Sequence, residues 1–191
     1  LFKYNIIFQP ETDVLASAAV NRTLLTALHE HELIQVLREL TLLDEAKASL
    51  CTLLIGEGIL ELLGDPLPDA VGGMAIGADP ISAAVITTAA YQGLSLRGFI
   101  VRKETKEHGK GRMVEGPVEP GQHVVIVEDV VTTGGSSLRA IEHVEAFGLH
   151  VDGVIAIIDR LEGGAEAFAE RGYKLRTLLT IEDLGITTGD D

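Results

Sequence analysis

The pattern of apolar and polar residues changes near residue 69 of this 191-residue chain. Before that point, within residues 12–63, apolar residues recur at helical spacing, among them Leu24, Leu28, Leu40 and Leu54. After it, short β-rich runs alternate with helical segments, which is typical of a parallel sheet with crossover helices. The pattern therefore predicts a mostly helical first part and an α/β second part.

The second part is predicted to contain five strands and three helices. The expected strands are Ala70–Gly77, Leu96–Val101, His123–Val127, Val151–Ile158 and Lys174–Ile181. The expected helices run from Asp79, as N-cap before Pro80, to about Gln92, and over Ser136–Phe147 and Glu162–Arg171.

Composition supports one α/β domain. Apolar residues make up 46% and aromatic residues only 4%, so Leu, Ile, Val and Ala must build the core. Because no Pro/Gly/Ser-rich linker divides the chain, we expect a single domain over residues 1–191. Residues 1–68 would form its helical N-terminal region and residues 69–184 its core, a mainly parallel sheet flanked by helices.

Charge and cysteine content limit the possible partners and location. The net charge of −14 argues against nonspecific nucleic-acid binding, which depends on Lys and Arg. The only cysteine, Cys51, allows no intrachain disulfide, and no stretch of 18 residues lacks a charge. We therefore expect a soluble cytoplasmic protein that binds neither nucleic acid nor membrane.

Cations are nevertheless concentrated in one segment, which we call the basic loop (residues 102–116). Five of the 15 Lys and Arg residues lie within it: Arg102, Lys103, Lys106, Lys110 and Arg112. The segment is too charged and too rich in glycine to form a packed element, so it predicts a mobile loop that meets an anion. The alternative without a functional role is a solvated surface hairpin.

A second segment, VVIVEDVVTTGGSSL (residues 124–138), combines a strand, an acidic pair and a turn that opens a helix. Its TTGGS turn (residues 132–136) can offer backbone N–H groups, hydroxyls and a helix N-terminus to a phosphate. Glu128 and Asp129 can accept hydrogen bonds from vicinal sugar hydroxyls, so a ribose 5-phosphate would satisfy both parts. Alternatively, Thr, Gly and Ser are only turn and cap residues. It is not a P-loop, because no Lys follows the glycines.

Residues 124–138 resemble the phosphoribosyl pyrophosphate (PRPP) motif of type I phosphoribosyltransferases. The segment FIVRKETKEHGKGRMVEG (Phe99–Gly116), which contains the basic loop, is similar to the catalytic loop of the orotate phosphoribosyltransferase family. The resemblance implies the type I fold with a small N-terminal hood. It also implies transfer of the 5-phosphoribosyl group from PRPP to orotate, giving orotidine 5′-monophosphate and pyrophosphate in pyrimidine biosynthesis.

The resemblance also assigns roles to individual residues. Lys106 and Asp129 would be catalytic, and Thr132 and Arg160, the latter within IIDRLEGG, would contact orotate. PRPP would be bound by Arg102, Lys103, Lys106, His108, Glu128, Asp129, Val130, Val131, Thr132, Thr133, Gly134, Gly135 and Ser136. Mg²⁺ would be held mainly by the cosubstrate, with no protein metal cage. A homodimer is implied, with Lys103 reaching the partner's site.

Two departures from the family pattern leave alternatives open. Gly72–Pro80 lacks a lysine that other members carry near Ala78–Pro80, and Thr23–Leu43 lacks their Ser-Gly and paired-Tyr segment. The second departure allows an altered hood, another base specificity or an error in this part of the sequence. Two other functions therefore remain: transfer to another base, such as a purine, and PRPP sensing by a regulator without turnover.

Overall fold

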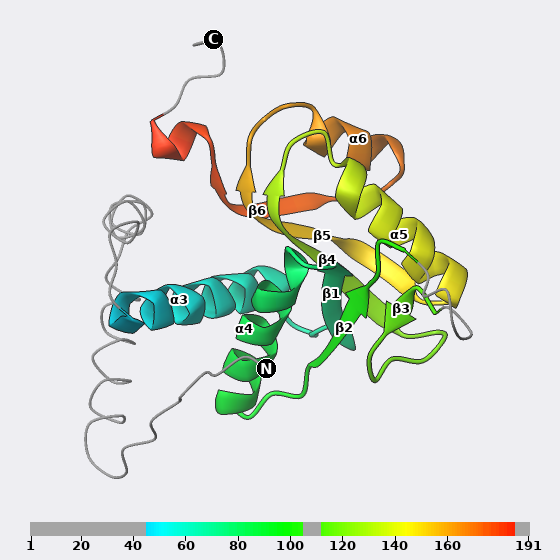
Figure 1. Cartoon of the computed structure of the whole chain (residues 1–191), viewed down its shortest axis with the longest axis horizontal. Coiled ribbons are helices and arrows are strands. Elements are labelled where there is room, and N and C mark those ends of the chain that lie inside the picture. Colours follow the sequence, from blue (N-terminus) through cyan, green and yellow to red (C-terminus); the bar gives the residue numbers. More distant parts are fainter. Residues whose placement is uncertain (1–44, 105–111, 186–191) are drawn as a thin grey trace. The chain divides into compact units, whose positions relative to one another are not determined.

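A computed structural model describes residues 45–104 and 112–185, which belong to one compact unit, Leu40–Asp191 (Figure 1). Its six-stranded sheet has the order β3-β2-β1-β4-β5-β6. The strands are β1 (Ala70–Met74), β2 (Arg97–Val101), β3 (Val114–Glu115), β4 (His123–Val131), β5 (His150–Asp159) and β6 (Leu175–Thr180). The helices are α3 (Glu45–Leu63), α4 (Ala78–Tyr91), α5 (Gly135–Phe147), α6 (Gly164–Glu170) and the short 3₁₀ helix η1 (Glu182–Leu184).

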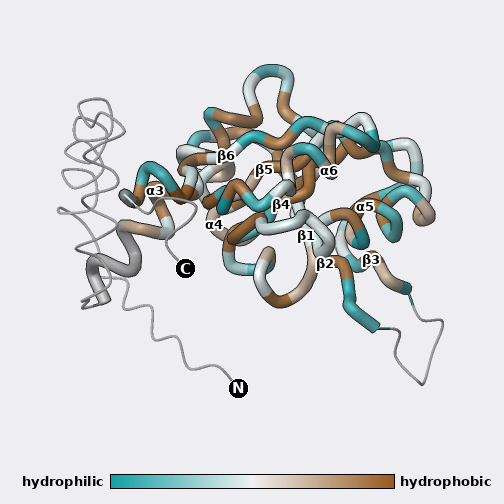
Figure 2. Tube along the Cα trace, turned by 90° about the horizontal axis from the view of Figure 1, so that it is seen from above, coloured by the Kyte–Doolittle hydropathy of each residue, from teal (hydrophilic) through white to brown (hydrophobic). Residues whose placement is uncertain are grey.

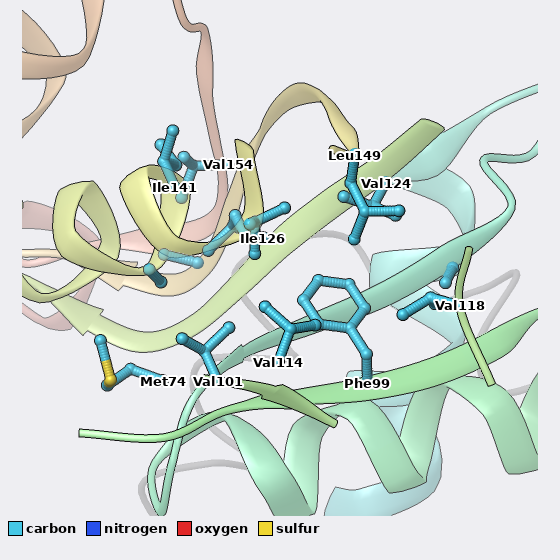
Figure 3. Close-up of a cluster of buried hydrophobic side chains, with 14 of the residues drawn as sticks. Met74, Phe99, Val101, Val114, Val118, Val124, Ile126, Ile141, Leu149 and Val154 are labelled. Carbon is cyan, nitrogen blue, oxygen red and sulfur yellow. The ribbon is translucent and has the colours of Figure 1, made fainter. Parts of the chain in front are cut away.

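Every strand pair is parallel except β2–β3, so the predicted mainly parallel sheet is confirmed. Alternating β4 residues serve two separate cores, because successive side chains of a strand point to opposite faces. Val125 and Val127 pack with buried residues of α3 and α4. Val124 and Ile126 pack with Ile141 of α5 and with Phe99 on the other face (Figure 3). Hydrophobic stretches recur among the strands and are interrupted by paler and polar positions (Figure 2).

The structure corrects several predicted boundaries. β1 ends at Met74, and α4 begins at Ala78 with Gly77 as its N-cap. The predicted cap, Asp79, therefore lies inside the first helical turn. β4 continues to Val131, so the acidic pair belongs to the strand rather than to the turn. The basic loop does contain an ordered element, since β3 pairs with β2. α6 is shorter than predicted, beginning at Gly164.

Tertiary pairing explains the longer β4. Its polar end is hydrogen-bonded to β5 through the pairs Glu128↔Ala156, Val130↔Ile158 and Val131↔Asp159. Ladder bonds to a neighbouring strand outweigh the weak strand preference of acidic residues, which reflects context more than backbone. The end of α5 at Gly148, in left-handed conformation, agrees with the sequence prediction. None of the helices within the described ranges has the length and apolar character needed to cross a bilayer.

A cluster of charged side chains lies at the amino ends of the strands, opposite the edge that carries the TTGGS turn. His123 Nδ1 is 2.7 Å from Asp152 Oδ1, and the rings of His123 and His150 are 5.1 Å apart. Asp69 accepts the backbone N–H of His123 and pairs with Arg97. The hydrogen bond and charge of Asp152 raise the pKa of His123 above 6.5. The folded protein therefore favours the protonated imidazole more than a free histidine side chain does.

We expect Asp152→Asn to lower the Tm at about pH 6 and to change it much less at about pH 9. The folded-state pKa of His123 is raised, so its pairing stabilises the fold below the ordinary pKa and is lost as pH rises through the folded-state pKa. Thermal unfolding at several pH values measures this difference. Glu142→Gln, which breaks the exposed pair with Arg171, is the control whose effect should not depend on pH in this range. Parallel pH profiles for the two variants would contradict the assignment.

Candidate functional site

The acidic pair is divided between the two faces of β4. Glu128 is only 6% exposed, and its Oε2 accepts a 2.7 Å hydrogen bond from Ser137 Oγ in the first turn of α5. Asp129 is exposed, and its Oδ1 accepts the backbone N–H of Val130 at 2.8 Å. The sequence placed these carboxylates side by side. The structure shows one of them buried against a helix and the other open to a ligand.

Burial raises the pKa of Glu128 above its ordinary value of 4.5, because desolvation disfavours the charged form. The hydrogen bond from Ser137 acts in the opposite direction, and the nearby carboxylate of Asp129 raises the pKa further. Ser137 thus favours the ionised state of a carboxylate that its surroundings would otherwise tend to protonate.

The TTGGS turn directly follows β4 and ends in the first residues of α5. Gly134, at φ 77°, is the N-cap of α5, a left-handed conformation that glycine adopts without steric cost. The first N–H groups of a helix have no partner within it, and the helix dipole places positive potential there. Thr133 is exposed beside them, while Thr132 and Ser136 are partly buried. This arrangement suits a phosphate group.

The turn is held from behind by α6. A Cβ at Gly164 would lie 2.3 Å from Val131 Cγ1 and 2.6 Å from the carbonyl oxygen of Thr132, so only glycine allows this approach. On the next turn of α6, the fully buried ring of Phe168 lies against Gly134, 3.0 Å from where a Cβ would stand. The TTGGS turn therefore rests on a packed support.

Arg160 follows β5 and lies beside the TTGGS turn. Its backbone N–H donates to the carbonyl oxygen of Val131 at 2.9 Å, the residue that precedes the turn. Its guanidinium is 50% exposed and pairs with Glu162 at 2.7 Å. The structure thus brings together two segments that lie far apart in the sequence, as the prediction of a shared site requires.

A pocket of about 370 Å³ adjoins the exposed acid of the pair. It is lined by Thr52 and Ile55 of α3, Ile76, Gly77, Pro80, Ile81 and Ala84 at the start of α4, Asp129, and Ile157 of β5. Most of this wall is apolar, and Asp129 is its only ionisable group. The carboxylate therefore faces a concave surface at the carboxyl ends of β1, β4 and β5, where parallel sheets bind their ligands.

The ordered base of the basic loop holds one of the predicted cations. Nε and Nη2 of Arg102 donate hydrogen bonds to the two carboxylate oxygens of Glu115 in β3, at 2.7 and 2.8 Å. Lys103 is exposed. Lys106 and His108 lie outside the described residues, so their predicted roles stay predictions. Sequence reasoning missed the pair of Arg102 with Glu115, because it depends on β3.

Within residues 45–104 and 112–185, no group of three His, Cys, Asp or Glu side chains could hold a metal ion.

The hydrogen bond of Ser137 to Glu128 is the contact that the sequence prediction overlooked. The position of Ser137 in the first turn of the helix that follows the acidic pair was a usable signal, because that turn faces the strand end.

Three comparisons with known proteins agree with this geometry. The family model described as "Phosphoribosyl transferase domain" matches residues 68–183. The chain is 58% identical over 139 residues to the orotate phosphoribosyltransferase of Rhodopirellula baltica, covering 70% of this chain and 72% of the relative. It also resembles the crystal structure of Mycobacterium tuberculosis H37Rv orotate phosphoribosyltransferase in complex with PRPP, with 36% identity and a TM-score of 0.69. That match covers 82% of this chain and 91% of the other.

A phosphoribosyltransferase from Corynebacterium diphtheriae is a further structural relative, at 41% identity and a TM-score of 0.66. It is covered over 83% of its length, and this chain over 78%. The sequence-based prediction of the type I fold is thereby confirmed.

We expect Ser137→Ala to raise the pKa of Glu128 further, because the substitution removes the donor that favours the ionised carboxylate while burial remains. An NMR titration that follows the Glu128 side-chain carboxyl carbon measures this shift. Ser136→Ala is the matched control. Ser136 contributes least among the causes of the shift, so its loss should move the pKa less. A larger shift for Ser136→Ala, or none for Ser137→Ala, would contradict this account.

Proposed function

The chain belongs to the phosphoribosyltransferase family, and within it we infer the activity of an orotate phosphoribosyltransferase. This enzyme transfers the 5-phosphoribosyl group from PRPP to orotate, giving orotidine 5′-monophosphate and pyrophosphate. The observation that carries the inference is the backbone hydrogen bond of Arg160 to Val131, which joins an arginine to the residue that precedes the TTGGS turn. The guanidinium fork suits the carboxylate of orotate, and the turn suits the 5-phosphate.

The phosphate and ribose of PRPP would bind along the end of β4. We assign the 5-phosphate to the N–H groups and hydroxyls of the TTGGS turn, which α6 supports from behind. Asp129 is exposed and oriented by the N–H of Val130, so it is the acid best placed for ribose hydroxyls. Its negative charge would also stabilise positive charge on the ring. Glu128 is predicted to contact the same hydroxyls through the small part that remains accessible.

The reaction breaks the bond between the anomeric carbon and a pyrophosphate oxygen, whose electron pair leaves with the pyrophosphate. A ring nitrogen of orotate supplies the pair for the new bond and loses its proton, which a pyrophosphate oxygen or solvent water accepts. Negative charge therefore grows on the leaving group, where the basic loop can supply cations: Arg102, Lys103, Lys106 and His108. The pairing of Arg102 with Glu115 anchors one end of that loop to the sheet. Closure over the substrates would also exclude water.

We propose Mg²⁺ as the cofactor of the reaction. The donor set fits an ion held mainly by cosubstrate oxygens, because Asp129 offers one exposed carboxylate and Mg²⁺ commonly takes only one or two from the protein. Bound there, the ion would neutralise charge on the pyrophosphate.

Orotate would lie between the TTGGS turn and Arg160. Thr132 directly follows Val131, which pairs with Asp159 at the end of β5, and the Arg160 side chain is half exposed, so we expect both to reach one planar ligand. The ion pair with Glu162 lies at the surface and is worth little in water, so a substrate carboxylate can replace it.

A homodimer and a cytoplasmic location stay predictions. For the dimer we propose that Lys103, which is exposed at the start of the basic loop, reaches the site of the partner subunit. Because the loop leaves an edge of the sheet, next to β2 and β3, such a contact requires no rearrangement of the core.

The activity is tested by mixing the protein with Mg²⁺, PRPP and one of four bases, orotate, adenine, hypoxanthine or uracil, and by measuring nucleotide formation. We expect turnover with orotate alone. Turnover with another base instead would reassign the base specificity. PRPP binding without turnover on any base would favour a regulator.

Lys106→Ala should lower kcat by about 100-fold, because a cation that meets the leaving group acts mainly in the transition state. The Kd for PRPP should change by less than about threefold, since the TTGGS turn holds the 5-phosphate independently. Steady-state kinetics and calorimetric titration separate the two quantities. Lys174→Ala, at an exposed lysine before β6, is the control. Equal losses of kcat and of PRPP affinity would refute the assigned role.

A further inference from the structure

The segment Asp159–Leu161, which comprises the last residue of β5 and the two residues after it, forms a hydrogen bond at each of its three residues. The carbonyl oxygen of Asp159 accepts the N–H of Ile181 at 2.8 Å, and the N–H of Arg160 donates to Val131 at 2.9 Å. The N–H of Leu161 donates to Oδ1 of Asp159 at 2.9 Å. Two of these bonds are to backbone groups of neighbouring segments, and the third depends on one side chain.

That side chain is a buried carboxylate. Asp159 is 5% exposed, and it belongs to a small group of buried polar residues in the described part of the chain. Its oxygen bonds to the N–H two residues later, which is the geometry of an Asx turn. Burying an acid is unfavourable unless its hydrogen bonds are made. The presence of a buried carboxylate at position 159 therefore calls for a stabilising or functional explanation.

Leu161 adopts a conformation that requires such a bond. Its φ of 58° makes it the one non-glycine residue with positive φ in the described ranges. A leucine avoids this region because of its Cβ, so something must hold it there. The hydrogen bond from Leu161 to Asp159 is the contact that selects this conformation.

Arg160 lies between these two residues. Its side chain is half exposed, and among the described residues its one ion pair is with Glu162, which is itself exposed, so packing does little to orient it. For such a side chain, the position and direction of the backbone set the region that the guanidinium can reach. The backbone of Arg160 is defined by the Asp159–Leu161 bond on one side and by Val131 on the other.

We propose that Asp159 is a positioning residue for the base site: by holding Leu161, it directs Arg160 toward the carboxylated base without touching the substrate. The inference rests on the proposed function, in which Arg160 binds orotate. The 5-phosphate site should not depend on it, because α6 supports the TTGGS turn through Gly164 and Phe168. Asp159 therefore affects one substrate and not the other.

The test compares Asp159→Asn, Asp159→Ser and Asp159→Ala in steady-state kinetics with both substrates. Asn keeps the acceptor oxygen, Ser offers a weaker one, and Ala removes it. We expect the KM for orotate to rise in the order Asn, Ser, Ala, by about tenfold for Ala, and the KM for PRPP to change by less than about twofold. If the Ala variant does not fold, the order of Asn and Ser carries the same information.

A double-mutant cycle shows whether Asp159 acts through Arg160. Arg160→Ala alone should raise the KM for orotate, and adding Asp159→Ala should raise it no further. Additive effects, an unchanged KM for orotate, or equal rises in both KM values would overturn the proposal. Turnover of orotate by the wild-type protein distinguishes a failure of the proposed function from a failure of the positioning role. If it does not turn over orotate, the proposed function fails; if it does and the Asp159 series is flat, only the positioning role fails.

Discussion

The parallel pairing of β4 with β5 is the contact on which the rest of the site depends. Its register places Val131 opposite Asp159, so the residues that continue from both strands emerge side by side. One strand leads into the TTGGS turn and the other into Arg160, and a backbone hydrogen bond joins them. A shift of one residue would turn every side chain to the other face and separate the TTGGS turn from Arg160, the two parts of the proposed site.

The supports behind this edge are close-packed. Gly164 allows α6 to approach the carbonyl of Thr132, and Phe168 fills the space beneath Gly134. A helix N-terminus attracts an anion through N–H groups that must already point the same way, so rigid support matters more than the number of donors. Preorganisation of this kind lets cosubstrate binding proceed without ordering the turn first.

The acidic pair shows how one strand can assign two roles to similar groups. Strand alternation places Glu128 against α5 and Asp129 toward the pocket beside α4. Burial then raises the pKa of Glu128, while Ser137 limits that rise. The exposed acid is available to a substrate, and the buried one is tied to the helix that carries the phosphate site.

The sequence by itself determined the order of five of the six strands and of the helices between them in residues 69–184, the TTGGS turn and its neighbouring acids, because periodicity, caps and glycine conformations act over a few residues. It also identified Arg160 and the basic loop as candidate site residues. Only the tertiary structure decided that β4 extends through the acidic pair, that Arg102 pairs with Glu115, and that Ser137 and Asp159 are buried and hydrogen-bonded to Glu128 and Leu161. The strand extension and the Arg102–Glu115 pair depend on strand register, which joins residues far apart in the chain. The partners of Ser137 and Asp159 lie close by in the sequence, but the burial of these two side chains follows only from the fold.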